Sequence, residues 1–342
     1  MAESKALNRP TIADVAERAG VSIATVSRVI NRTGPVAEET AAQVHVAIAD
    51  LKYVPHAAAR GLASRKTQTL GLLLPGISDQ FSAAMLRGIE AGAREGGYDL
   101  LIHSTYHGDG ASGVAVPRRL GEHNTDGLLI FTDSLDEAEL TRLYQLGFPM
   151  VLLHRSPPSS LNIPSIAFEN KSGSRKLIDH LIEAHGRRRI AFLAGPEGNE
   201  DSDWREMGYR EALEAHGLHF DPALVARGGF DQVQAQTSVE SWLEQNLEID
   251  AIFSGDDEAG IGTLAALRRE GKHVPEDIAL VGFDDIDVSR YLVPPLTTVR
   301  APIEQAGREA ARQLVQLIRT GQADPLVLFP TELVIRRSCG CG

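Results

Sequence analysis

The sequence predicts a small all-α unit followed by an α/β core that contains two doubly wound parallel-sheet lobes. Three observations lead to this fold class. Residues 11–31 carry two sets of helix-start signals in close succession. From Thr69 onward, short apolar runs alternate with longer helical stretches, and the alternation then restarts. At 342 residues, the chain is also too long for one compact core.

The composition is that of an ordinary globular protein, with 43% hydrophobic and 23% charged residues. The sequence has no run of about 18 apolar residues, and its first ten residues have neither an apolar segment nor a small-residue cleavage site. We therefore expect no membrane contact, no signal peptide and a cytoplasmic location.

The charge is distributed unevenly along the chain. The formal net charge is -12, yet residues 1–66 contain nine basic and six acidic residues, whereas the remainder contains 25 basic and 40 acidic residues. A basic N-terminal unit on an acidic body is typical of a DNA-binding module attached to a unit that does not bind DNA.

The first predicted helix follows Thr11, which caps it with Asp14 as the partner in a shortened capping box. Its apolar residues recur at helical spacing over barely two turns, and Gly20 ends it. Ser22 caps a second helix. The inward residues of this second helix are Val26, Val29 and Ile30.

A third helix is expected in the segment EETAAQVHVAIADLKYVP, with Pro55 as its stop. Its apolar side carries Val44, Ile48 and Leu51. The first two helices are too short to persist alone, so they must pack on the third. The three together predict a helix-turn-helix with its bundling partner.

The second helix of such a motif meets base edges in the major groove near its N-terminus. Arg28 can donate two hydrogen bonds to a guanine edge, and Ile23 and Ala24 can lie against thymine methyl groups. The short hydroxyl side chains that suit phosphate oxygens are Ser22, Thr25 and Ser27. The alternative is a helical bundle without a DNA role, in which Arg28 is a solvated surface charge.

Residues 55–68 form an Ala-rich, basic linker. Gly61 weakens a helix by roughly 1 kcal/mol relative to Ala, so the free segment should be mostly unfolded. Such a segment can fold when two copies meet in a widened minor groove, with an apolar wedge such as Leu62 between base steps. The expected DNA contacts are Ser22, Ile23, Ala24, Thr25, Ser27, Arg28, Asn31, Pro55, Arg60 and Leu62.

Two sets of apolar runs predict the strands of the two lobes. The first set is TLGLLLP, YDLLIHS, GLLIFT and PMVLLHR, and the second is SIAFE, RIAFLAGP, LVARGGF, AIFSGDD and IALVGFDD. An internal echo supports two lobes, because Gly71 to Gly88 and Ala191 to Gly208 both span 17 residues. Two such lobes imply a ligand cleft lined by loops at the carboxyl ends of the strands.

The loops after these strands carry carboxylates, arginines and aromatic rings. Carboxylates accept hydroxyl hydrogens, a guanidinium donates in a fixed fork, and aromatic faces cover the C–H side of a sugar ring. The set suits a polyhydroxylated neutral ligand, although each Asp is also a candidate helix cap and Phe230 a candidate core residue. These loop residues are Asp79, Phe81, His154, Arg155, Trp204, Arg205, Phe230, Asp256, Asp257, Asp284 and Asp285.

Motifs for catalysis are absent from the sequence, which has no Walker loop, GxSxG, HExxH or GxGxxG after a strand. Paired acids can in principle cleave a glycosidic bond, but a helix-turn-helix neighbour disfavours this interpretation.

Cys339 and Cys341 are the two cysteines of the chain and lie near the C-terminus, so a frayed reduced tail is expected rather than a disulfide or a four-ligand zinc site. Arg187, Arg188 and Arg189 are expected in a solvated turn. We expect no catalytic residue, no cofactor and no metal.

From Pro10 to about Cys341, the chain resembles the lactose-repressor (LacI) family of bacterial transcription regulators. The resemblance rests on TIADVAERAGVSIATVSRVIN, YVPHAAARGL, IAFLAGP, VPEDIALVGFDD and PPLTTVRAP, in order and at the family's separations. It implies a homodimer on pseudo-palindromic double-stranded operator DNA, with hinge helices in the minor groove. It also implies a core similar to periplasmic sugar-binding proteins.

The resemblance also implies residue roles. The family's base-reading positions match Ile23, Ala24 and Arg28, and its minor-groove wedge matches Leu62. Its effector-contacting positions match Asp79, Phe81, His154, Phe168, Arg205, Phe230, Asp256 and Asp284. The chain departs from the family pattern at the two apolar base readers, at Asp79-Gln80-Phe81-Ser82 where Asn-Pro-Phe-Phe is frequent, and at His154 where a sugar-binding Asp can occur. A Leu-rich tetramer-forming tail is not expected.

We therefore expect a repressor whose operator affinity changes when an effector closes the cleft. A sugar is the favoured effector, and a purine-type ligand is the alternative. The rival functions are a sugar-binding or transport component and a carbohydrate enzyme with a fused DNA-binding unit. The expected domains are a DNA-binding unit at 1–54, a hinge at 55–68, and a core at 69–342 with an N-terminal lobe of about 69–167 and 299–326 and a C-terminal lobe of about 168–298 and 327–342.

Overall fold

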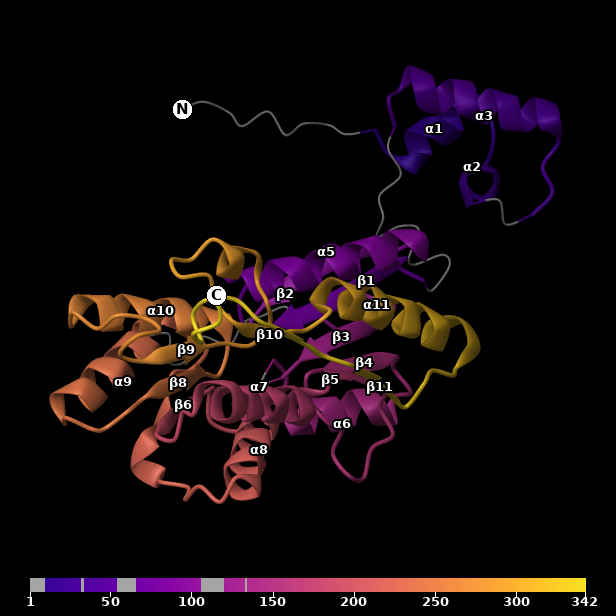
Figure 1. Cartoon of the computed structure of the whole chain (residues 1–342). Coiled ribbons are helices and arrows are strands. Elements are labelled where there is room, and N and C mark those ends of the chain that lie inside the picture. The colour runs from indigo at the N-terminus through magenta and orange to yellow at the C-terminus, as the bar shows by residue number, and fades with distance from the viewer. Residues whose placement is uncertain (1–9, 32–33, 54–65, 106–119, 133) are drawn as a thin grey trace, which may run out of the picture. The chain divides into compact units, whose positions relative to one another are not determined.

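The computed structural model describes residues 10–31, 34–53, 66–105, 120–132 and 134–342 (Figure 1). The chain divides into two compact units, Met1–Gln68 and Thr69–Gly342. Three of the expected DNA-contacting positions, Pro55, Arg60 and Leu62, lie outside the described residues. No helix among the described residues is long and apolar enough to cross a membrane.

The first unit is a bundle of three helices, α1 (Ile12–Ala19), α2 (Ile23–Asn31) and α3 (Glu38–Asp50). Their shared core contains Val15, Val26 and Val44, each fully buried. This core contains residues from all three helices, which explains why helices of eight and nine residues persist here. An ion pair of 2.8 Å between Arg18 and Asp50 also joins α1 to α3.

The ends of α1 have the structure that the sequence predicts. The Thr11 hydroxyl accepts a hydrogen bond from the Asp14 amide, and the Asp14 carboxylate accepts one of 2.6 Å from the Thr11 amide. Gly20 ends the helix with a φ of 67°, a left-handed conformation that glycine adopts without strain. The turn to α2 therefore follows from local chemistry.

The second unit contains two α/β lobes. The N-terminal lobe is a six-stranded parallel sheet in the order β11-β5-β4-β3-β1-β2. Its strands are β1 (Thr69–Leu74), β2 (Asp99–Ser104), β3 (Gly127–Phe131), β4 (Met150–Leu153), β5 (Ser165–Phe168) and β11 (Leu326–Phe329). Its helices are α5 (Gln80–Glu95), α6 (Glu137–Gln145) and α11 (Ile303–Thr320). α5 and α11 pack together over one face of the sheet, and α6 covers the other.

The C-terminal lobe has a four-stranded parallel sheet in the order β7-β6-β8-β9, with helices on both faces. Its strands are β6 (Ile190–Ala194), β7 (Val225–Arg227), β8 (Ala251–Ser254) and β9 (Ala279–Val281). Its helices are α7 (Asn170–His185), α8 (Glu200–Ala215), α9 (Gln232–Glu244), α10 (Asp257–Arg269) and the short 3-10 helices η1 (Pro222–Leu224) and η2 (Asp287–Arg290). A separate antiparallel pair joins β10 (Thr298–Arg300) to β12 (Glu332–Val334).

Glycines at equivalent places in the two lobes support the internal echo of the sequence. A Cβ on Gly88 in α5 would lie 2.0 Å from the Glu304 carbonyl oxygen of α11, and one on Gly208 in α8 would lie 2.2 Å from the Lys171 carbonyl oxygen of α7. Only glycine permits backbones to approach this closely. The two lobes thus use the same device to pack a neighbouring helix.

The grouping of SIAFE with the strands of the second lobe is wrong, whereas the expected bound of about 167 already leaves Ser165–Ala167 in the N-terminal lobe. These residues form β5, which pairs with β4 and β11 in the sheet of the N-terminal lobe. The chain then crosses to the C-terminal lobe at Glu169, crosses back after Arg300, and crosses again between β11 and β12. The N-terminal lobe therefore extends to Phe329 rather than 326. An apolar run has the same appearance in either lobe, so its sheet is decided by pairing.

The expectation of a frayed C-terminal tail is also wrong. Leu280 donates its amide to the Ser338 carbonyl oxygen at 2.9 Å, and the Ser338 hydroxyl donates to the Leu280 carbonyl oxygen at 2.6 Å. Cys339 is fully buried in the core of the C-terminal lobe, and Cys341 is half-buried. The tail is therefore a packed part of this lobe.

Candidate effector cavity and DNA-reading helix

The helix α2 has one buried face and one open face. Val26 is buried, whereas Ile23, Ala24 and Arg28 are exposed, and the side chain of Ile23 is 51% accessible. An exposed arginine can donate to a guanine edge, and an exposed apolar side chain can contact a thymine methyl group. Arg28 makes no ion pair with any described residue, so its fork is available to a partner.

The polar residues of α2 are more restrained than the sequence indicates. The Ser22 and Thr25 hydroxyls lie 2.9 Å apart, and Ser22 accepts the Thr25 amide at 3.1 Å as a helix cap. Asn31 donates its side-chain amide to the Ser27 hydroxyl at 3.2 Å. These four residues therefore hold the helix in shape, and each hydroxyl keeps further hydrogen-bonding capacity for phosphate.

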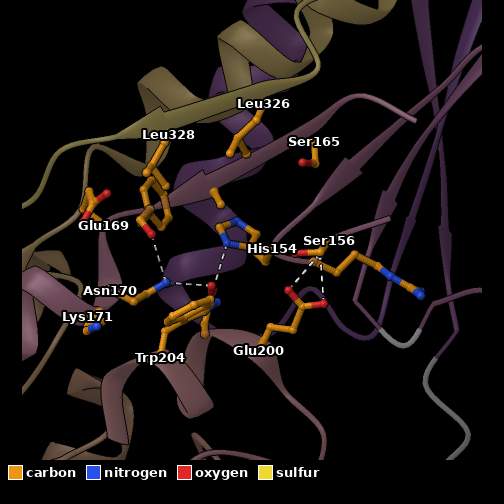
Figure 2. Close-up of a pocket in the computed structure, with 14 residues that line it drawn as sticks. His154, Ser156, Ser165, Glu169, Asn170, Lys171, Glu200, Trp204, Leu326 and Leu328 are labelled. Atoms are coloured by element: carbon orange, nitrogen blue, oxygen red, sulfur yellow. Dashed lines mark hydrogen bonds and ion pairs between the residues drawn. The ribbon is translucent and has the colours of Figure 1, made fainter. Parts of the chain in front are cut away.

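A cavity of about 270 Å³ lies where the two lobes meet (Figure 2). Its wall is formed by the end of β4, strands β5 and β11, and the first turns of α7 and α8. The lining residues are His154, Arg155, Ser156, Ser165, Ala167, Phe168, Glu169, Asn170, Lys171, Glu200, Asp201, Trp204, Leu326 and Leu328. Of the eight expected effector residues, His154 and Phe168 line it directly.

His154 joins the lobes through a buried hydrogen bond. Its Nδ1 lies 2.9 Å from the Asp201 carboxylate of α8, and Asn170 donates to the other oxygen of that carboxylate at 2.7 Å. Burial alone raises the pKa of Asp201, but His154, Arg205 and the Asn170 hydrogen bond outweigh it and hold the pKa below its usual value. Asp201 is therefore an anion at neutral pH and can orient the imidazole.

The second ring nitrogen of His154, Nε2, is buried and has no hydrogen-bond partner among the described residues. Aromatic rings surround the imidazole, with centroids 5.0 Å away for Phe168, 5.3 Å for Phe81 and 5.4 Å for Phe131. A buried polar atom costs free energy unless it is paired, so this nitrogen is suited to a ligand hydroxyl or carbonyl at the cavity wall.

Arg205 is the centre of a second buried network, directly beside the cavity. Only 2% of its surface is exposed. It donates to Asn170 Oδ1 at 2.9 Å, to the Gly255 carbonyl oxygen at 2.6 Å and to Asp284 Oδ1 at 3.0 Å. Its guanidinium also lies 3.9 Å from the ring centroid of Phe283. Asn170 thus links the Arg205 network to Asp201 and His154.

Acidic groups crowd the C-terminal side of this network. Burial raises the pKa of Asp284, and the ion pair with Arg205 offsets only part of that effect. Burial also raises the pKa of Asp256 well above its usual value, with the neighbouring Asp284 as the next cause. Asp256 caps α10, because its carboxylate accepts the Ala259 amide at 2.8 Å. A ligand that donates hydrogen bonds would stabilise the ionised form of these carboxylates.

The remaining expected effector residues have mainly structural contacts. Asp79 caps α5 by accepting the Ser82 amide at 2.6 Å, and Phe81 packs edge-on against Phe168. The Arg205 guanidinium lies 5.3 Å from the ring centroid of Phe230. These three side chains do not line the cavity.

Backbone strain marks three of the expected positions. His154, Phe230 and Asp284 have φ angles of 59°, 56° and 102°, in a region that side-chain-bearing residues rarely occupy. Such strain persists only where the surroundings enforce it, and it clusters at ligand sites. Asp285 shares this feature with a φ of 55°, but its contacts are different.

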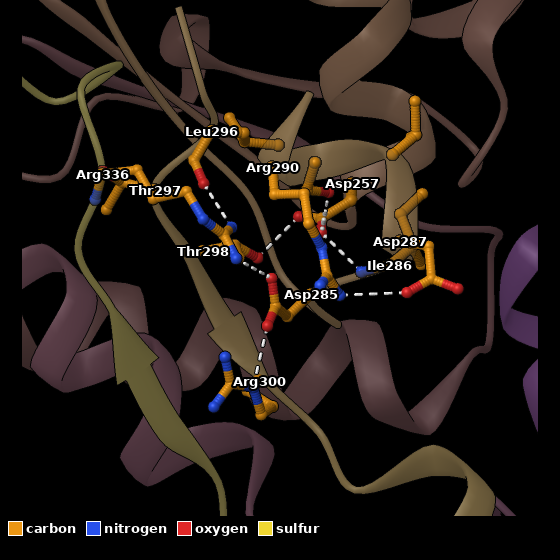
Figure 3. A network of polar contacts seen from close by, with 12 residues as sticks. Asp257, Asp285, Ile286, Asp287, Arg290, Leu296, Thr297, Thr298, Arg300 and Arg336 are labelled. Atoms are coloured by element: carbon orange, nitrogen blue, oxygen red, sulfur yellow. Dashed lines mark hydrogen bonds and ion pairs between the residues drawn. The ribbon is translucent and has the colours of Figure 1, made fainter. Parts of the chain in front are cut away.

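Asp257 and Asp285, which follow strands like the other candidates, belong to a structural network (Figure 3). Asp285 pairs with Arg300 at 2.8 Å and Arg336 at 2.5 Å. Asp257 accepts the Thr298 hydroxyl at 2.6 Å, together with the Ser289 hydroxyl and the Ile286 amide. Both aspartates fasten the segment after β9 to β10 and have no free oxygen for a ligand.

Several cavity residues were missed by sequence reasoning. Asn170 and Asp201 lie in the first turns of α7 and α8, and Asn170 comes only two residues after β5. Glu200 accepts the Ser156 amide with both oxygens, at 2.9 and 2.8 Å, across the lobe junction. The sequence feature that could have indicated these residues is the acidic first turn of α8, but acidic residues are common at any helix N-terminus.

A helix-turn-helix unit joined to a two-lobed core with a cavity at the lobe junction defines the class of DNA-binding transcription regulators with a periplasmic-binding-protein-like core. The family model described as "Bacterial regulatory proteins, lacI family" matches residues 11–56, and the model described as "Periplasmic binding protein-like domain" matches residues 178–339. The chain belongs to the lacI family, and it is a transcription regulator.

The alignments with relatives cover nearly the whole chain. The ribose operon repressor of Halalkalibacterium halodurans is 35% identical, with 96% of each chain covered. The transcriptional regulator CelR, solved in complex with cellobiose, is 32% identical with a TM-score of 0.69, and the match covers 96% of this chain and 100% of that one. The Lac repressor dimer bound to operator and an anti-inducer is 25% identical with a TM-score of 0.80, and the match covers 97% and 99%.

Proposed function

We propose that the protein is a homodimeric repressor that binds a pseudo-palindromic operator and changes its operator affinity when a small sugar binds at the lobe junction. It acts on operator DNA in the cytoplasm and performs no catalysis. The observation that carries the effector proposal is His154, which lines the cavity and has a buried, unpartnered Nε2. The proposed domains are a reader at 1–54, a hinge at 55–68 and a receptor core at 69–342.

The reading of DNA is assigned to the open face of α2. Arg28 supplies a bidentate donor for guanine, and Ile23 and Ala24 supply apolar contact for thymine methyl groups. Ser22, Thr25, Ser27 and Asn31 serve phosphate oxygens and the shape of the helix. Pro55, Arg60 and Leu62 are proposed to contact the minor groove. The Lac repressor, whose dimer is bound to its operator in a solved structure, supports the dimeric arrangement.

A sugar fits the cavity in size and chemistry. About 270 Å³ is close to the lower end of typical ligand sites, roughly 300–1,000 Å³, so the ligand is small. The indole of Trp204, which is 45% exposed at the rim, offers a face for the C–H side of a pyranose ring. Asp201, Asn170 and His154 offer acceptors and donors for hydroxyls. The names of relatives that act on a ribose operon or bind cellobiose agree with this class.

The proposed mechanism is a shift between open and closed lobe arrangements. His154 to Asp201 and Ser156 to Glu200 bridge the lobes on the cavity side. On the other side, the Gln80 amide donates to Glu258 at 3.3 Å. A ligand that contacts both lobes strengthens closure and thereby changes the position of the N-terminal lobes in the dimer. Typical coupling of about 1–3 kcal/mol corresponds to about 5- to 150-fold in operator affinity.

The test combines a thermal-shift screen with operator binding. The full chain is screened against mono- and disaccharides and against purines, because a specific ligand raises the melting temperature by mass action. Operator affinity is then measured by fluorescence anisotropy with and without each hit. A sugar that shifts both readings supports the proposal. A purine hit with the same effect, or operator binding that no ligand alters, contradicts the sugar assignment.

A Trp204→Ala variant localises the site. Trp204 is partly exposed and makes none of the buried polar contacts, so its removal should leave the fold and ligand-free DNA binding intact. We expect effector affinity to fall by about tenfold or more. Tyr291→Ala is the matched control, because this ring is 75% exposed and lies away from the cavity lining. Equal effector affinity in the two variants would show that the effector binds elsewhere.

A further inference from the structure

Four side chains with nitrogen or sulfur ligand atoms meet where the C-terminal tail touches α7. His180 and His185 come from the last turns of α7, and Cys339 and Cys341 come from the tail. Their ligand atoms all lie within 4.8 Å of one another. Cys341 Sγ is 3.4 Å from His185 Nε2 and 3.7 Å from His180 Nε2.

These separations fit a tetrahedral zinc ion. With Zn–N near 2.0–2.1 Å and Zn–S near 2.3 Å, neighbouring ligand atoms lie about 3.3–3.8 Å apart. Both contacts of Cys341 already fall in that range. The widest separation in the cluster needs to close by about 1 Å, which side-chain rotation alone can supply.

Cys339 Sγ donates to the Arg336 carbonyl oxygen at 3.4 Å, but hydrogen bonding does not satisfy Cys341 and the two histidines. A neutral Cys341 thiol has one hydrogen but faces two imidazole nitrogens. A neutral imidazole presents one nitrogen lone pair to a metal ion, and the Nε2 atoms of His180 and His185 both lie near Cys341 Sγ. The rings stand nearly perpendicular, at 82°, with centroids 5.0 Å apart. One cation between the two rings and the two sulfurs satisfies all four groups.

The surroundings also suit a bound metal. The Thr297 hydroxyl donates to Cys339 Sγ at 3.2 Å, the kind of outer hydrogen bond that orients a thiolate ligand. Gly340, with a φ of 114°, lets the chain turn between the two cysteines. The spacing of His180 and His185, with four residues between them, falls within the histidine spacing of Cys₂His₂ zinc sites. Two thiolates also neutralise the charge of Zn²⁺.

We propose that this cluster is a structural Cys₂His₂ zinc site formed by His180, His185, Cys339 and Cys341. The ion fastens the C-terminal tail to the end of α7 and so links two segments that are far apart in the sequence. Four protein ligands leave no open coordination position, so the ion is structural rather than catalytic. At its other end, α7 begins with Asn170, which contacts Asp201 and Arg205. The ion thus stiffens a helix that carries part of the effector network.

The first test measures metal in the full-length protein, purified under reducing conditions without chelator. Inductively coupled plasma mass spectrometry should find about one zinc per chain in the wild type and less than about a tenth of that in Cys341→Ser and His185→Gln. His123→Gln is the control, because its imidazole is 91% exposed and remote from the cluster in sequence and lobe. Its zinc content should equal that of the wild type.

Two further measurements on the wild type keep the result independent of variant folding. Cobalt added to the metal-free protein should give the intense visible bands of tetrahedral, thiolate-bound Co²⁺. A strong chelator should lower the melting temperature by about 5 °C, and the same chelator should leave Cys341→Ser unchanged. Zinc content that is equal in the wild type and both ligand variants overturns the proposal. So does a Cys339–Cys341 disulfide in the reduced preparation, or a cobalt spectrum without thiolate bands.

Discussion

Replacing Arg205 by Ala should destabilise the core more than any exposed arginine on the same helix. The substitution removes three hydrogen bonds, to Asn170, Gly255 and Asp284, from a side chain that is only 2% exposed. Breaking a buried ion pair by removing one partner costs about 3–5 kcal/mol. Since burial already raises the pKa of Asp284, this carboxyl can take up a proton in the variant, so we expect a cost of about 3 kcal/mol.

The matched control is Arg210→Ala. Arg210 also lies on α8 and pairs with Glu206, but its side chain is 51% exposed, so its loss should cost about 1 kcal/mol or less. In differential scanning calorimetry of the full chain, the core transition should fall by about 6–12 °C for Arg205→Ala and by no more than about 4 °C for the control.

A double-mutant cycle with Asp284→Asn tests the reasoning directly. If the cost of Arg205→Ala comes from the unpaired carboxyl, it should shrink by about 1 kcal/mol or more once Asp284 is an amide. Equal costs in both backgrounds, or equal transitions for Arg205→Ala and Arg210→Ala, would refute the assignment of Arg205 to a buried ion-paired network. Asp284→Asn is preferable to Asp284→Ala, because the amide keeps an acceptor for Arg205.

Three more outcomes are expected. Arg28→Ala should weaken operator binding by about 6- to 150-fold and binding to random duplex far less; equal losses in anisotropy titrations would mean that Arg28 touches only phosphate. Burial raises the pKa of Asp257 to about 8, so the carboxyl binds its proton more tightly in the folded than in the unfolded state. The protonated carboxyl therefore stabilises the fold fully below about pH 4, and this stabilisation is lost as the pH rises through about 8. Urea unfolding should therefore show that the free energy of unfolding falls by about 2 kcal/mol less in Asp257→Asn than in the wild type between pH 6 and pH 8. An identical fall in both proteins would contradict the raised pKa of Asp257. Thr11→Ala removes the cap of α1 and should speed amide exchange in that helix about fivefold, measured by mass spectrometry, whereas unchanged exchange would show that the cap adds no stability.

The first unit was predictable because the sequence signals that define its helices act over a few residues. Thr11, Asp14 and Gly20 act within one or two turns of chain, and the apolar residues within each helix recur at helical spacing. The parallel strands were predictable for a similar reason, since short apolar runs between amphipathic helices have few other solutions. Local signals also placed His154 and Asp284 correctly at strand ends beside the lobe junction.

The sequence by itself thus determined the class of fold, the helix-turn-helix with its exposed residues on α2, and the position of several candidate residues after strands of the core. Tertiary structure alone decided which lobe holds β5, that Asn170 links Arg205 to Asp201, and that Asp285 serves two arginines rather than a ligand. It also brought Cys339 and Cys341 to two histidines more than 150 positions earlier in the chain. The physical reason is that capping and amphipathic periodicity act over a few residues, whereas strand pairing, buried ion pairs and ligand clusters depend on separations in space.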